Sequence, residues 1–142
     1  MRFILAILLI LQFATRGPRW SPFESAKDSA RGVILKAEQG SALLVVICKD
    51  RVPGIMVALP DVTGASPAEV RLRWGNGALV YEDWTGAPGM VLYPNWQKGD
   101  HLAQLEKADR LAVEFRDLGW GEFDLSEKRA ALEVIRACRG GS

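Results

Sequence analysis

His101 is the only histidine of this 142-residue chain, so a serine or cysteine nucleophile with a histidine base would have to use it. It follows Asp100 near the predicted start of a helix, where we expect an exposed or capping side chain. One histidine and two cysteines do not provide a zinc site with the usual ligand spacing. The segment Gly75-Asn76-Gly77 is a turn signal and does not fit a phosphate-binding loop. We therefore predict no metal site and no cofactor.

Glu82 and Asp83 are adjacent carboxylates that could in principle perform acid–base chemistry on a glycan. Neighbouring residues of a strand point to opposite faces, which is the wrong geometry for two carboxylates acting on one bond. The acids Asp61, Glu69 and Asp117 are scattered over predicted loops and solvated faces. These residues therefore predict a protein that is not an enzyme.

The N-terminus carries an apolar run that predicts export. Arg2 supplies one positive charge, and Gln12 is the only polar residue within residues 3–14. A membrane-spanning helix needs about 20 apolar residues, so this run is too short and is typical of a signal peptide. We predict a signal peptide over residues 1–14 and a periplasmic or secreted location. An uncleaved membrane anchor is the alternative.

Cys48 and Cys138 are expected to pair, because two cysteines in an exported chain most simply form a disulfide. Their wide separation argues against a redox-active pair, which normally has C-x-x-C spacing. Two independent buried thiols are the alternative. Cys48 lies on a predicted buried strand and Cys138 on the apolar stripe of the last predicted helix, so both side chains are expected to point inward.

Composition indicates one globular domain. Apolar residues make up 49% of the chain, and 18 basic against 17 acidic residues give a net charge of +1. No basic stripe is present to follow phosphates, so we predict no nucleic-acid partner. We expect residues 15–30 to be a polar approach without regular structure, with Trp20 and Phe23 docking it, and residues 31–142 to form the domain.

The stretch from Leu43 to Cys48 is the predicted central strand. Six large apolar residues occur in succession, which suits a strand buried on both faces. The strands on either side are expected to form an antiparallel meander with it, joined by turns at Gln39-Gly40 and near Pro53-Gly54. In chain order, period-two patterns and turn signals predict strands over residues 32–38, 43–48, 55–59, 69–74, 78–84, 90–93, 110–116 and 120–125.

Two helices complete the prediction. The first covers about residues 97–107, with Asp100 as an alternative N-cap. The second begins near Leu125 or Ser126, with Asp124 and Glu127 as a capping box, and ends near Ala137. Its apolar stripe consists of Ala131, Val134, Ile135 and Cys138. The predicted fold is therefore α+β, an antiparallel arrangement of seven to eight strands with two helices, the C-terminal helix tied to the central strand by the disulfide.

Several aromatic residues lie near predicted strand ends and loops. Trp84, Tyr93 and Trp96 could form a surface for a partner or a sugar, since aromatic residues are favoured at binding hot spots. The alternative is that these aromatic side chains cap the open ends of a small core.

The order of these motifs resembles the small periplasmic proteins associated with type VI secretion, the VasI/TagO family. The resemblance rests on a strand ending in Cys48, on Glu82-Asp83-Trp84, on Tyr93-Pro94 before a Leu-x-x-Leu helix, on Phe123-Asp124-Leu125 and on a helix ending Ala137-Cys138. It covers about residues 32–139. The resemblance implies an exported accessory protein without catalytic residues.

The expected function is therefore that of a non-catalytic exported accessory protein that binds another envelope or secretion-system component. A small exported inhibitor, or a ligand- or glycan-binding module that acts at the cell wall, is the alternative. A membrane contact is expected only through an uncleaved N-terminus.

Overall fold

A computed structural model describes residues 20–25, 29–60, 68–87, 91–94 and 100–140 of the chain. Strands β2 (Ala30–Lys36), β4 (Leu43–Lys49) and β5 (Val52–Ala58) form the predicted antiparallel meander. Strand β1 (Trp20–Ser25) pairs with β2 at one edge, and β8 (Val91–Tyr93) pairs with β5 on the other side. These five strands are called sheet A below.

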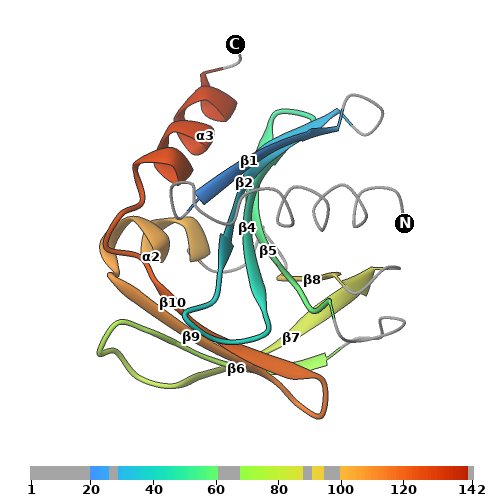
Figure 1. Cartoon of the computed structure of the whole chain (residues 1–142), viewed down its shortest axis with the longest axis vertical. Coiled ribbons are helices and arrows are strands. Elements are labelled where there is room, and N and C mark those ends of the chain that lie inside the picture. Colours follow the sequence, from blue (N-terminus) through green and yellow to red (C-terminus); the bar gives the residue numbers. More distant parts are fainter. Residues whose placement is uncertain (1–19, 26–28, 61–67, 88–90, 95–99, 141–142) are drawn as a thin grey trace.

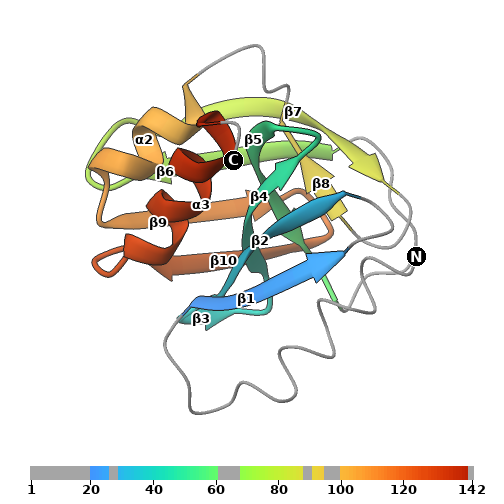
Figure 2. The ribbon, with the colours of Figure 1, turned by 90° about the horizontal axis from the view of Figure 1, so that it is seen from above.

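The hairpin signal at residues 75–77 joins β6 (Ala68–Trp74) to β7 (Val80–Ala87). Strand β9 (Arg110–Phe115) pairs with β6, and β10 (Gly119–Asp124) pairs with β9. These four strands are called sheet B. Strand β7 also continues into sheet A, because residues 85–87 pair with β8. The result is one continuous antiparallel sheet folded into two halves, shown in Figures 1 and 2.

A two-residue strand, β3 (Gln39–Gly40), also links the halves. It lies between β2 and β4 in the sequence and pairs with β10. Gly40 has a φ of 91°, and a Cβ there would lie 2.4 Å from the Trp120 carbonyl oxygen. Gly40 stands opposite Gly121, so the absence of side chains permits this close approach.

The main core lies between the two halves and is covered on one side by the helices α2 (His101–Lys107) and α3 (Arg129–Arg139) (Figure 1). Helix α3 lies against β2, β4 and β5, and α2 lies against β5. Among the largest fully buried side chains of this core are Trp84, Phe115, Phe123, Leu44, Ile55, Leu59, Leu72, Leu92 and Leu105.

The predicted Cys48–Cys138 disulfide is present. It joins the end of β4 to the last turn of α3, with the two Cα atoms 5.6 Å apart. Both cysteines are buried. The apolar stripe of α3 also agrees with the prediction at Ala131 and Ile135, whereas Val134 is half-buried. The α+β fold, with two helices among the described residues and a disulfide from the last helix to a central strand, is thus confirmed.

The predicted number of seven to eight strands is wrong, because the part of the chain that the structure describes already forms a sheet of ten. Both missing strands have a clear reason. Strand β1 falls in the expected polar approach and contains Pro22, yet Trp20 and Phe23 are buried and anchor it. The Trp20 indole nitrogen donates a hydrogen bond to the Glu127 carbonyl oxygen at 2.6 Å. Strand β3 is too short to leave a pattern, and its sequence has the appearance of a turn.

The last helix starts later than predicted, at Arg129. Asp124 belongs to β10, and its carboxylate accepts a hydrogen bond from the Ser126 backbone instead of capping the helix. The Glu127 carboxylate accepts one from the Arg129 backbone at 3.1 Å. The first described helix begins at His101, which agrees with the Asp100 alternative, although Asp100 makes no side-chain capping bond.

Candidate functional site

The outer face of sheet B carries a row of four side chains, one from each strand. Tyr81 of β7 stands opposite Arg71 of β6, Arg71 opposite Glu114 of β9, and Glu114 opposite Trp120 of β10. Directly paired residues of antiparallel strands share a face, so all four side chains point away from the core. We call these four residues the aromatic–arginine row. With strands about 4.8 Å apart, the two aromatic residues stand about 14 Å from each other.

The aromatic–arginine row is unusually exposed for its composition. Tyr81 exposes 60% of its surface and Trp120 44%. The Arg71 guanidinium donates a hydrogen bond to the Glu114 carboxylate, and this bond, together with the charge of Glu114, raises the pKa of Arg71. Because both side chains are about half exposed, the ion pair adds little stability. The row therefore consists of a fixed charged pair between two accessible aromatic rings.

A shallow cavity of about 290 Å³ lies beside the row. Its lining continues the alternation of β6 and β9, in which Leu72 and Val113 face the core while Arg71, Arg73 and Glu114 face outward. This alternation agrees with the period-two pattern that predicts a strand over residues 69–74. Residues that line the cavity outside the row include Arg73, Leu79, Ala112 and Glu122.

Trp84 is not on a surface that a partner could contact. The structure buries it in the main core with 2% of its surface exposed, in edge-to-face contact with Phe115 at 5.4 Å between ring centroids. The structure therefore does not support a binding role for Trp84. Its burial agrees better with the alternative, in which the aromatic side chains belong to the core. Tyr93 is half-buried and packs on an apolar cluster of sheet A. Trp96 lies outside the described residues.

The expectation of an exposed or capping histidine is also wrong. His101 exposes 8% of its surface, and its Nε2 atom lies 2.8 Å from the Glu82 carboxylate. The same carboxylate oxygen accepts a hydrogen bond from the Trp84 indole at 2.9 Å. Glu82 thus satisfies two buried polar groups that would otherwise lack partners. Asp83 is exposed while Glu82 is half-buried, as expected for neighbours in a strand.

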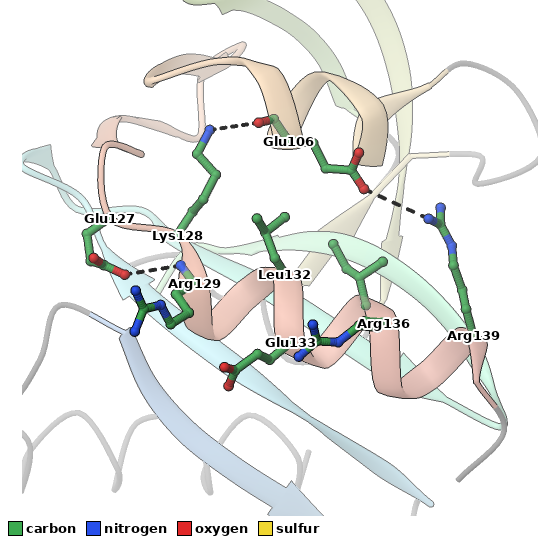
Figure 3. Close-up of a pocket in the computed structure, with 9 residues that line it drawn as sticks. Glu106, Glu127, Lys128, Arg129, Leu132, Glu133, Arg136 and Arg139 are labelled. Atoms are coloured by element: carbon green, nitrogen blue, oxygen red, sulfur yellow. Dashed lines mark hydrogen bonds and ion pairs between the residues drawn. The ribbon is translucent and has the colours of Figure 1, made fainter.

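A second hollow, of about 780 Å³, lies along α3 beside α2 (Figure 3). Leu132 points from α3 toward α2, whereas Glu133 lies on the other side of the helix. An ion pair between Arg139 and Glu106 at 3.9 Å joins the two helices. The charges of this hollow are mixed, so its electrostatics favour neither an anion nor a cation. Its lining residues are Glu106, Glu127, Lys128, Arg129, Leu132, Glu133, Ile135, Arg136 and Arg139.

Lys128 closes one end of this hollow and caps α2. Its ammonium group donates hydrogen bonds to the carbonyl oxygens of Leu105 at 3.0 Å, Glu106 at 3.2 Å and Ala108. These carbonyls lie at the negative end of the α2 dipole, which a cation stabilises. Partial burial lowers the pKa of Lys128, although the charges of Asp109 and Glu106 act in the opposite direction.

Substitution of Lys128 by Met is expected to lower the free energy of unfolding by about 1–3 kcal/mol, since hydrogen bonds from a charged donor are lost at the end of a helix. Urea unfolding followed by tryptophan fluorescence measures this change. Lys107→Met is the matched control, because Lys107 lies in the last turn of α2 but is exposed. Equal losses for the two variants would contradict the capping role.

The comparisons with known proteins identify no relative. The chain matches no protein-family model, no curated protein sequence and no solved structure. Within residues 20–140 as described, no helix is long and apolar enough to cross a membrane. The described residues also contain no group of three or more His, Cys, Asp or Glu side chains that could hold a metal ion.

Sequence reasoning did not select the aromatic–arginine row as a site. In the sequence, Trp120 only begins a predicted strand and Arg71 only lies within one, so neither residue belongs to a motif that indicates binding. The row becomes visible when the register of β6, β7, β9 and β10 is known. A hairpin register for the turn at residues 75–77 could have placed Tyr81 beside Arg71, but the pairing of β6 with β9 is not local.

Proposed function

We propose that this protein is a non-catalytic exported accessory protein that binds another envelope component. The proposed partner is an envelope or secretion-system protein, in line with the resemblance to the type VI secretion-associated family. The apolar N-terminal run supports export to the periplasm or the medium. The Cys48–Cys138 disulfide supports the same location, because disulfides persist in oxidising compartments.

The observation that carries the binding role is the aromatic–arginine row. Tryptophan, tyrosine and arginine are the residue types most enriched at protein–protein hot spots. Here Tyr81, Arg71 and Trp120 stand in register on the outer face of sheet B. The polar pair between the rings would set the orientation of a partner, while the rings supply apolar area. This assigns the binding role to Tyr81 and Trp120 in place of Trp84.

The second candidate function is a glycan- or ligand-binding module, or an inhibitor, that acts at the cell wall. The cavity beside Trp120 favours it, because charged side chains surround a volume of about 290 Å³ next to an exposed aromatic ring. Aromatic rings stack on sugar rings, and neighbouring Arg and Glu side chains can hydrogen-bond to hydroxyl groups. This volume is at the lower end of the range for small-molecule sites.

The two functions are separated by crosslinked affinity capture of the exported protein, run beside pelleting with purified peptidoglycan. We expect capture of a defined envelope protein, and loss of that capture in the Tyr81→Ala/Trp120→Ala variant. A hot-spot side chain contributes about 2 kcal/mol or more, so each substitution is expected to weaken binding by about thirty-fold.

Val52→Ala is the matched control for this experiment. Val52 exposes 47% of its surface on β5, so its substitution removes an exposed apolar side chain that is not part of the row. If the double variant still captures the protein partner, the row is not the binding surface. If the wild-type protein pellets with peptidoglycan and the double variant does not, the second function is favoured. If neither assay retains the protein, both functions are contradicted.

A further inference from the structure

One arginine on the outer face of sheet B differs from its neighbours in having no acidic partner. Three arginines of β6 and β9, or directly after β9, form ion pairs, which are Arg71–Glu114, Arg110–Glu38 and Arg116–Glu69. Arg73 is exposed on β6 and forms no ion pair within the described parts of the chain. The reason is local, because the residue opposite Arg73 on β9 is Ala112, which carries no charge.

An acidic residue without an ion-pair partner lies on the other side of Ala112. Glu122 of β10 stands opposite Ala112, and β6, β9 and β10 lie side by side (Figure 2). Among the described residues, Glu122 also forms no ion pair. With strands about 4.8 Å apart, the Cα atoms of Arg73 and Glu122 are about 10 Å from each other. We call Arg73, Ala112 and Glu122 the charged notch, since a small side chain separates two opposite charges.

The cavity of about 290 Å³ on this face is lined by all three residues of the charged notch. Trp120 also lines it and lies two residues before Glu122 on β10, so both side chains are on the same face of the strand. Leu79, with 41% of its surface exposed, adds apolar lining. The cavity therefore offers one cation, one anion and an aromatic ring to a small molecule.

The two charges of the notch favour a ligand that carries both signs. A guanidinium binds a carboxylate with two parallel hydrogen bonds, and a carboxylate accepts charge-assisted hydrogen bonds from an ammonium group. An ammonium group beside Glu122 would also be attracted to the Trp120 ring. A ligand with only a negative charge would be repelled by Glu122, and one with only a positive charge by Arg73. A neutral sugar would leave both charges without a partner.

We propose that the charged notch binds a short zwitterionic peptide, with a carboxylate of the peptide on Arg73 and an amino group on Glu122 beside Trp120. This inference rests on the second candidate function, a ligand-binding module at the cell wall, and names its ligand class. The stem peptides of peptidoglycan retain free amino and carboxylate groups, whereas its sugar strands carry neither. The peptide part of the cell wall, and not the glycan part, is therefore the ligand.

The first test is a nuclear magnetic resonance titration of the exported, oxidised protein with the stem tripeptide L-alanyl-γ-D-glutamyl-meso-diaminopimelate. We expect shifts at the Trp120 indole and the Ala112 amide, and about ten-fold weaker binding when the amino groups of the peptide are acetylated or its carboxylates amidated. An oligomer of N-acetylglucosamine is the sugar-only probe. Binding of this oligomer without binding of the tripeptide would overturn the inference and keep the second function. Binding of neither probe would contradict both.

The second test combines variants with the modified peptides. Arg73→Met is expected to weaken binding of the tripeptide by about ten-fold and to leave binding of the amidated peptide unchanged, because that peptide has already lost its carboxylate. Glu122→Gln should weaken binding of the tripeptide in the same way and leave binding of the acetylated peptide unchanged. Arg116→Met is the matched control, since Arg116 is exposed on the same sheet but does not line the cavity.

Ala112→Leu tests the gap itself. A leucine at this position of the strand would occupy the space between the two charges and should abolish binding of the tripeptide, while circular dichroism confirms that the sheet is intact. Tripeptide binding that survives Ala112→Leu in a folded protein would overturn the proposal. Equal losses of affinity for the tripeptide and the amidated peptide in Arg73→Met would overturn it as well, and this second result does not depend on how well the leucine variant folds.

Discussion

Reduction of the Cys48–Cys138 disulfide is expected to lower the free energy of unfolding by about 4–5 kcal/mol. The bridge closes a loop of 90 residues, and loss of this constraint increases the entropy of the unfolded chain. For a domain of this size the melting temperature should fall by about 15 °C. Calorimetry with and without a phosphine reductant measures the shift.

The control is the double variant Cys48→Ala/Cys138→Ala. Both positions are buried, so alanine avoids placing an unpaired hydroxyl group in the interior. The variant should melt near the reduced wild-type protein and show no further change on reduction. A wild-type transition that is the same with and without reductant would contradict a stabilising role of the disulfide.

Replacement of Trp84 by alanine is expected to lower the free energy of unfolding by about 3–5 kcal/mol, in the range for truncation of a buried aromatic residue. The indole fills the core against Phe115, and it also makes an edge-to-face contact with the His101 ring, at 6.1 Å between ring centroids. The substitution further removes one of two hydrogen bonds to the Glu82 carboxylate. Urea unfolding followed by circular dichroism measures the loss.

Trp120→Ala is the matched control, because the same residue type is removed from an exposed position. Surface substitutions usually change stability by less than about 0.5 kcal/mol. In the capture assay the Trp120 position should matter and the Trp84 position should not. Trp84→Phe keeps the core filled and should leave binding unchanged, whereas Trp120→Ala should weaken binding. A Trp120→Ala variant as unstable as Trp84→Ala would contradict the exposed position of the row.

Local sequence patterns predicted most of the fold. Period two identifies the inward residues of β2, β4, β6 and β9, and the repeat of α3 aims Cys138 at the sheet. Both patterns arise within a single element, because they depend only on which of its side chains face the core. The two missed strands depend on non-local contacts instead. Strand β1 is held by Trp20 against Glu127, and β3 by a pair of glycines across the two halves.

The candidate site was harder to predict, because strand β7 does not show a clean alternation. Its inward parity carries Glu82 and Trp84, and its outward parity carries Tyr81 and Asp83. A carboxylate at an inward position conceals which face is the core side. Glu82 is accommodated there because it pairs with His101, and this partner is 19 residues further along the chain. The roles of the two tryptophans, one in the core and one exposed, follow from the tertiary structure alone.

The short contact between β3 and β10 has a consequence for the rate of folding. The meander of β2, β4 and β5 uses turns of a few residues, so it can form early from local contacts. The pairs Gly40–Gly121 and Gln39–Glu122 instead join segments more than half the chain apart. Closure of such a long loop is entropically unfavourable before the contact exists. We therefore expect the meander to gain protection from hydrogen exchange first. The amides of Glu38 and Ala42, which donate hydrogen bonds to carbonyl oxygens of β10, should gain it last, on the millisecond-to-second timescale typical of non-local strand pairing.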